Sequence, residues 1–262
     1  MDGKLNAIVT AGGTPRPGEP LYPYTLGKAK AVLDINGKPM VQWVLDALSG
    51  SKEIGRVVLV GLPPSIQLEC SHAVTYLENA GSLIGNIQVG VQELLKNGRL
   101  EERALVVASD IPAIRPEIVD WLVQGVEQSD FDVYYSIVER SKMERRFPDS
   151  RRTYVHLKDG EFCGGDMNAI RLGAALQDNP AWRRVVEARK SPLKQAQLIG
   201  FDTLFLLLLR QMSVRRAERM ISQRLKIRGH ALVCPYPEIG MDIDKPFQLD
   251  MLRHALVKQG GL

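Results

Sequence analysis

Short apolar runs alternate along the first half of the chain with segments whose apolar residues recur every three or four positions. The runs predict buried strands, and the segments between them predict helices. The expected strands are 5–10, 57–60, 74–77 and 104–108, and the expected helices are 39–50, 83–96 and one that begins at Pro116. This alternation is typical of crossover units on a mostly parallel sheet with both faces covered.

The second half of the chain has a less regular pattern. The expected strands there are 131–139, 153–157, 168–172 and 231–234. A helical pattern extends over 180–228, and a last helix runs to the end. We therefore predict one α/β domain over residues 1–262, a three-layer α/β/α, Rossmann-like arrangement around a mostly parallel mixed sheet. A basic helical insertion at about 180–229 would precede its last strand.

Composition excludes several classes of protein. The 262 residues are 45% hydrophobic and 24% charged, as in an ordinary globular domain, and the three cysteines have no CxxC spacing that would suggest a thiolate zinc site. The first residues do not have the pattern of a secretory leader. The longest apolar run, 204–209, is far shorter than the roughly 20 residues needed to span a bilayer. We expect a cytoplasmic protein without a transmembrane segment.

The charge is unevenly distributed. Residues 183–228 carry a net charge of +9, whereas the whole chain carries +4. An anionic ligand or surface near this segment would explain the excess, and so would a solvated helical face rich in arginine. The pattern leaves open a peripheral contact with an anionic membrane, and also a homodimer. We expect no nucleic-acid partner.

Chemistry-bearing residues follow the first predicted strand. It ends in Ala11-Gly12-Gly13, and Arg16 and Lys30 come next, the latter upstream of Gly37-Lys38-Pro39-Met40. Ligands of open α/β sheets bind beyond the carboxyl ends of strands. Paired glycines let the backbone approach a phosphate, which the two cations would neutralise. Neither GxxxxGK[ST] nor GxGxxG occurs, which argues against a P-loop NTPase and a classical dinucleotide dehydrogenase.

Carboxylates end two other segments. Asp110 follows the strand 104–108, and Asp242 and Asp244 bracket Ile243. In an extended segment alternate side chains share a side, and two such carboxylates repel each other unless a cation or proton lies between them. Mg²⁺ favours one or two carboxylates with waters and phosphates. The alternatives are a turn or helix cap at Asp110 and a capping box on the last helix.

In combination these motifs resemble the signature of the MobA-like nucleotidyltransferases, which include molybdenum cofactor guanylyltransferases and sugar- or polyol-phosphate cytidylyltransferases. Ala29 replaces the proline that usually precedes the signature lysine, and the loop between Arg16 and Lys30 is long. The resemblance implies a nucleotide-diphospho-sugar transferase-like fold. It also implies Mg²⁺-dependent transfer of an NMP group from an NTP to a phosphorylated small-molecule acceptor, with release of pyrophosphate.

The resemblance also implies residue roles. The catalytic residues would be Arg16, Lys30 and Asp110, the Mg²⁺ ligands Asp110, Asp242 and Asp244, and the nucleotide-binding residues Ala11, Gly12, Gly13, Gly85 and Asn86. The acceptor-side residues would be Gly165, Asp166 and Asn168. Lys194 is a further candidate for an acceptor phosphate, although a solvated lysine explains it equally, and 81–86 reads equally as a plain helix N-cap.

Two other functions fit the same residues. A GT-A-like glycosyltransferase would use an Asp-x-Asp metal site on a nucleotide sugar, and a non-catalytic regulatory protein would bind the nucleotide without turnover. The choice of NTP and acceptor depends on contacts that the sequence does not specify. The Lys30 segment favours a nucleotidyltransferase, because a glycosyltransferase expels a nucleoside diphosphate and has no pyrophosphate to hold.

Overall fold

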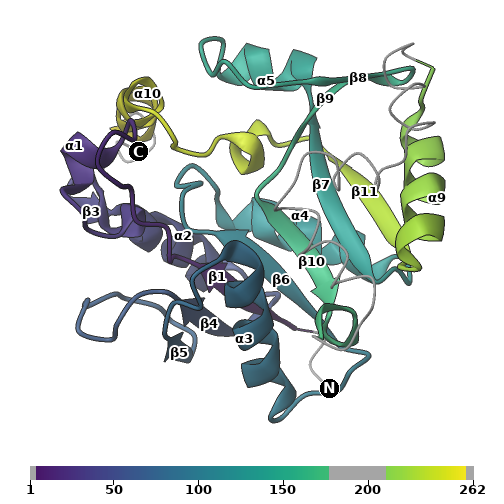
Figure 1. The fold of residues 1–262 in the computed structure, drawn as a ribbon, viewed down its shortest axis with the longest axis horizontal. Helices are drawn as coiled ribbons and strands as arrows, with labels where there is room; N and C mark the ends of the chain where they lie inside the picture. Colours follow the sequence, from purple (N-terminus) through teal and green to yellow (C-terminus); the bar gives the residue numbers. More distant parts are fainter. Residues whose placement is uncertain (1–3, 177–210, 258–262) are drawn as a thin grey trace.

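One mixed sheet organises the molecule (Figure 1). The computed structural model describes residues 4–176 and 211–257. The strand order is β5-β4-β1-β6-β10-β7-β9-β8. A further strand outside this order, β11, also pairs with β7. The strands are β1 (Leu5–Thr10), β4 (Ile54–Val60), β5 (Val74–Leu77), β6 (Arg103–Ala108), β7 (Val133–Glu139), β8 (Val155–Leu157), β9 (Gly160–Gly164), β10 (Met167–Arg171) and β11 (Gly229–Cys234).

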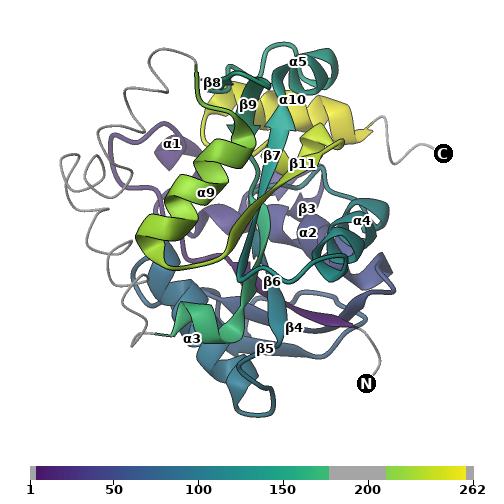
Figure 2. The ribbon, with the colours of Figure 1, turned by 90° about the vertical axis from the view of Figure 1, so that its right-hand side faces the viewer.

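Helices cover both faces of this sheet. Figure 2 shows α3 on one side and α2 and α4 on the other. The helices are α1 (Tyr22–Thr25), α2 (Met40–Gly50), α3 (Leu83–Leu95), α4 (Pro116–Glu127), α5 (Arg140–Arg146), α9 (Val214–Leu225) and α10 (Pro246–Val257). Short 3₁₀ turns are Lys30–Val32, Leu172–Ala175 and Pro237–Gly240, and Asp34–Ile35 (β2) pairs with Lys38–Pro39 (β3). None of the helices in the described ranges is long and apolar enough to cross a membrane.

The apolar runs become strands because both of their faces are buried. On β1, Ala7 and Val9 pack into the core under α2 and α4, whereas Ile8 packs into a second core under α3. A strand covered on both sides needs a continuous apolar run rather than an alternating one, as the sequence has here. The predicted three-layer α/β fold is therefore confirmed.

The direction of the strands determines where the site lies. β1 runs parallel to β4 and β6, so the turns that follow β1 and β6 meet at one edge of the sheet. Among the described strands, β9 and β10 run against the direction that the others share. The carboxyl ends of β1 and β6 thus carry the glycine turn and Asp110 side by side.

Most predicted elements are present with small shifts of their ends. The sequence patterns did not predict α1, α5, β9 or the β2–β3 pair, and the predicted strand 153–157 begins two residues before β8. The predicted helical segment 180–228 lies only in part within the described residues, which include its helix α9. This helix packs against β11. Residues 180–210 of that segment, Lys194 among them, lie outside the described residues, and the single domain with its basic insertion stays a prediction.

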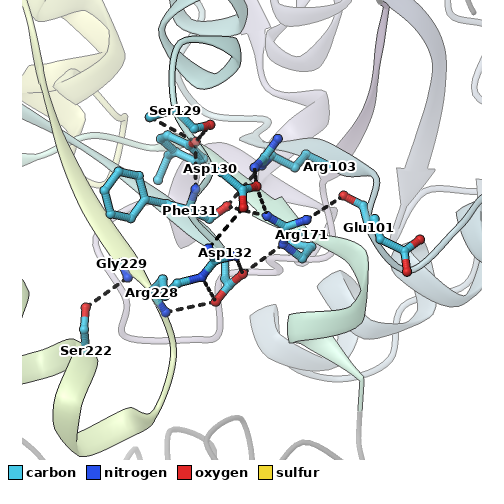
Figure 3. Close-up of polar contacts among 11 residues, drawn as sticks. Glu101, Arg103, Ser129, Asp130, Phe131, Asp132, Arg171, Ser222, Arg228 and Gly229 are labelled. Carbon is cyan, nitrogen blue, oxygen red and sulfur yellow. Dashed lines mark hydrogen bonds and ion pairs between the residues drawn. The ribbon is translucent and has the colours of Figure 1, made fainter.

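An ion-pair network holds the opposite end of the sheet together (Figure 3). Asp130 and Asp132, just before β7, accept hydrogen bonds from Arg171 at the end of β10 and from Arg228, which directly precedes β11. Arg103 at the start of β6 also binds Asp130. The network therefore connects four strands far from the carboxyl ends that carry the predicted site.

Candidate active site

The glycine turn after β1 packs against the loop that leads into α3. Asn79 donates from Nδ2 to the carbonyl of Gly12 at 2.8 Å, and Asn86 accepts from the N–H of Ala80 at 2.8 Å. A Cβ on Gly12 would lie 2.5 Å from Oδ1 of Asn79 and 2.7 Å from Nδ2 of Asn86. A side chain at position 12 would therefore collide with both amide groups, and glycine avoids this collision.

A cavity of about 630 Å³ opens between these loops and the end of β6. Its walls contain several of the predicted site residues, namely Gly12, Gly13, Arg16, Lys30, Asn86, Asp110 and Asp166. A cavity of this size at the carboxyl ends of the strands matches the usual dimensions of a small-molecule site. The structure therefore brings half of the predicted site residues to one cavity.

Lys30 is held in place by both its backbone and its ammonium group. Its N–H donates to the carbonyl of Gly13 at 2.7 Å, which ties the first turn of the 3₁₀ segment to the glycine turn. Its Nζ lies 2.6 Å from Oδ2 of Asp110 and 2.5 Å from Oδ1 of Asp244. Burial alone would lower the pKa of Lys30, but the two carboxylates outweigh it and raise the pKa. The ammonium group is therefore charged and fixed at the cavity wall.

The three predicted metal ligands converge. Asp110, Asp242 and Asp244 each offer a carboxylate oxygen within 4.8 Å of the others. The two segments are joined by the N–H of Ile243, which donates to the carbonyl of Asp110 at 3.1 Å, and the Ile243 side chain is fully buried. The side chain of Gln248 accepts from the N–H of Asp244. The N–H groups just before α10 are therefore satisfied by Gln248 and not by the carboxylate of Asp244.

The oxygen cluster fits a hard divalent cation. Oδ1 of Asp110 is buried and has no hydrogen-bond partner within the described residues. Buried polar atoms are usually satisfied, so an unpaired carboxylate oxygen facing two other carboxylates suggests that a ligand completes the group. Carboxylate oxygens are the donors that Mg²⁺ prefers. The role of these residues as metal ligands stays a prediction.

Arg152 is a residue of the site that sequence reasoning missed. It lies between α5 and β8 and donates from Nη1 to Oδ1 of Asp242 and from Nη2 to the carbonyl of Gly164, the latter at 3.2 Å. Its Nη2 lies 3.9 Å from Oδ2 of Asp166. Arginine in the polar run 149–153 has no sequence signal that distinguishes it from a solvated surface residue.

The predicted acceptor loop joins β9 to β10. The Asp166 side chain reaches the cavity, and burial together with the negative charge of Asp110 raises the pKa of its carboxyl to about 6. Asn168, on β10, joins β7 to the loop, since Oδ1 accepts from the N–H of Ser136 at 2.8 Å and Nδ2 donates to the carbonyl of Gly165 at 3.1 Å. Asn168 therefore shapes this loop, and acceptor contacts stay predictions.

Two predicted nucleotide-binding residues, the buried Ala11 and Gly85, are not among the residues that line the cavity. The exposed Arg16 lines it, and its N–H donates to Glu19 at 3.0 Å. Gly85 lies in the first turn of α3, where its N–H donates to the Ser82 hydroxyl at 3.0 Å. The plain N-cap reading of this segment is confirmed for Ser82, while Asn86 one turn on also lines the cavity.

Comparison with known proteins places these features in a family. The model of the MobA-like NTP transferase domain matches residues 7–227. A probable molybdenum cofactor guanylyltransferase of Pyrococcus horikoshii is 28% identical over 128 residues, which are 48% of this chain and 58% of that protein. The match therefore spans little more than half of that relative's length.

Solved structures extend the similarity to nearly the whole chain. A hypothetical transferase from Thermus thermophilus is 34% identical, with a TM-score of 0.81 over 94% of this chain and 99% of that one. A CMP-2-keto-3-deoxy-manno-octonic acid synthetase solved with CTP has a TM-score of 0.59 at 18% identity, over 98% of this chain and all of that one, and shows the fold alone. The chain belongs to the MobA-like NTP transferase domain family.

Proposed function

We propose that this protein is a nucleotidyltransferase. It transfers the NMP group of an NTP to a phosphorylated small-molecule acceptor and releases pyrophosphate, with Mg²⁺ held by Asp110, Asp242 and Asp244. The observation that carries the proposal is the position of Lys30 and Asp110 at the wall of a cavity that begins at the glycine turn, with Asp242 and Asp244 clustered beside Asp110. Bound Mg²⁺ would neutralise charge on the phosphate oxygens.

In this reaction an acceptor phosphate oxygen attacks the α-phosphorus. A new P–O bond forms, the bond from the α-phosphorus to its bridging oxygen breaks, and pyrophosphate leaves with the electron pair. A phosphate monoester has a second pKa of about 6, so it is largely dianionic at neutral pH and needs no general base. The protein's part is positioning and electrostatic stabilisation.

The chain's residues divide this work. Gly12 and Gly13 allow the triphosphate to approach the backbone at the end of β1, and Asn86 lies where the base and ribose would enter. Arg16 and Lys30 neutralise the β- and γ-phosphates and the departing pyrophosphate. The Gly165–Asp166 turn faces the same cluster from β9–β10 and receives the acceptor.

Pyrophosphate release is the test of this function. The wild-type protein, incubated with Mg²⁺, each NTP and a panel of sugar and polyol phosphates, should release pyrophosphate with one NTP, and Asp110→Ala should not. Asp46→Ala is a matched control, because Asp46 also pairs with a lysine, at 2.8 Å, but does not line the cavity. Release of a nucleoside diphosphate from a nucleotide sugar would favour the glycosyltransferase instead. Nucleotide binding without turnover would favour the regulatory protein.

A further inference from the structure

Arg152 connects the two halves of the site. Its Nη1 binds the carboxylate of Asp242, one of the three clustered aspartates, and its Nη2 binds the carbonyl of Gly164 at the start of the acceptor loop. Only 18% of its side chain is exposed. One guanidinium thus lies between the proposed metal ligands and the place where the acceptor would bind.

Three unsatisfied polar atoms belong to this guanidinium and to two carboxylates of the site. Nε of Arg152, Oδ2 of Asp166 and Oδ1 of Asp110 are buried and have no hydrogen-bond partner within the described part of the chain. Leaving such atoms unpaired is unfavourable, and native structures rarely do so. Donor and acceptor atoms are both left unpaired, which suggests that both a cation and an anionic group complete the site.

A cation on Asp242 and the guanidinium compete for the same oxygen. Mg²⁺ binds carboxylate oxygens at about 2.0–2.1 Å, so it would lie beside the Nη1 that now contacts Oδ1 of Asp242. Two like charges at that separation in a partly buried site repel strongly. A metal ion on that oxygen would therefore displace the guanidinium from Asp242.

We propose that Arg152 is the counter-ion of Asp242 in the metal-free site, that a divalent cation displaces it, and that the freed guanidinium then binds an anionic group of the acceptor beside Gly165. This inference rests on the proposed function and deepens it. Arginine suits the second role because its planar fork binds phosphate or carboxylate through two parallel hydrogen bonds. The consequence is an order of binding, with the metal first and the acceptor second.

Mn²⁺ titration of the full-length protein, followed by electron paramagnetic resonance of the free ion, tests the competition. Arg152→Gln should bind Mn²⁺ roughly tenfold more tightly than the wild type, because a positive charge has left the ligand oxygen. Arg152→Lys, which keeps the charge, should stay near the wild type. Arg151→Gln is the matched control, because this exposed neighbour loses the same charge but packs on the ring of Phe247. Equal or weaker binding by Arg152→Gln would overturn the proposal.

A second measurement uses the wild type and does not depend on how a variant folds. Phenylglyoxal modification of each arginine, located by tandem mass spectrometry, should be faster at Arg152 when Mg²⁺ is added and unchanged at Arg151. A rate at Arg152 that is unchanged or slower would overturn the displacement. Pyrophosphate release is measured in the same preparation to separate the two hypotheses. If pyrophosphate is released but Mg²⁺ does not change the modification rate of Arg152, only this inference is wrong. If Mg²⁺ raises the modification rate of Arg152 but no pyrophosphate is released, only the proposed function is wrong.

Discussion

At the residue scale, Lys30 shows how one side chain can organise a charged cavity. Its side chain is 15% exposed and its ammonium group contacts two aspartates that are 134 residues apart in the sequence, Asp110 and Asp244. Burial lowers the pKa of the lysine, but the two carboxylates raise it by more and keep the group protonated. The site therefore presents a fixed positive charge to the cavity.

Replacing Lys30 tests the value of that charge. Lys30→Ala should lose roughly 2–4 kcal/mol of transition-state stabilisation, the usual effect of deleting one preorganised donor. The measurement is kcat/KM for pyrophosphate release, with Lys28→Ala as the control because Lys28 is an exposed lysine of the same loop. An unchanged kcat/KM for Lys30→Ala would remove this residue from the mechanism.

The carboxyl of Asp166 should make stability depend on pH. Burial and then Asp110 raise its pKa from 3.8 to about 6, so the folded state binds this proton more tightly than the unfolded state. The free energy of unfolding should therefore fall as pH rises from about 4 to about 6. Asp166→Asn, melted in EDTA, should gain Tm relative to the wild type at pH 8 and gain little at pH 4. A larger gain at pH 4 would contradict this assignment.

At the element scale, the site depends on close packing between the turn after β1 and the start of α3. Gly12→Ala should cost roughly 1–3 kcal/mol of stability, as overpacking usually does, because its Cβ would collide with Asn79 and Asn86. It should also weaken NTP binding. Gly13→Ala is the control for the effect on stability alone, since a Cβ there would have no neighbour within 4 Å. Equal melting curves for the two variants would show that the loops separate freely.

The elements that sequence analysis missed lack a periodic signal. α5 has a single buried apolar residue, Met143, among charged residues, so its seven residues contain no apolar stripe. β9 begins and ends with glycine and reads as a turn. β9 pairs with β7, and α5 packs against β7. Both elements therefore depend on tertiary contacts that the local sequence does not reveal.

The candidate site was predictable where local motifs carry it. The turn after β1 and Asp110 each follow an apolar strand, and parallel strands place such ends together. Lys30 and the Asp242–Asp244 pair were predicted from the signature that their segments resemble. Arg152 was not predictable, because its partner Asp242 lies 90 residues away and its own segment is polar. Contacts across such separations depend on the assembled fold.

At the scale of the whole molecule, the network in Figure 3 should contribute to acid sensitivity. Hydrogen bonds from Arg171 and then Arg228 lower the pKa of Asp130 from 3.8 to about 2. Its contribution to stability is therefore present above pH 3.8 and is lost as pH falls toward 2. Asp130→Asn should lower Tm at pH 7, and the difference from the wild type should shrink below about pH 4. Thermal melts across this range that show a constant difference would contradict it.

Asp110, Asp242 and Asp244 are proposed to act as one metal site for a bound nucleotide. Thermal unfolding of the wild type and of Asp110→Asn, with each NTP in Mg²⁺ or in EDTA, tests it most directly. One NTP at 100 times its Kd should stabilise the wild type by about 2.7 kcal/mol in Mg²⁺, and should stabilise neither the wild type in EDTA nor the variant. Equal stabilisation of the wild type in Mg²⁺ and in EDTA would contradict the account.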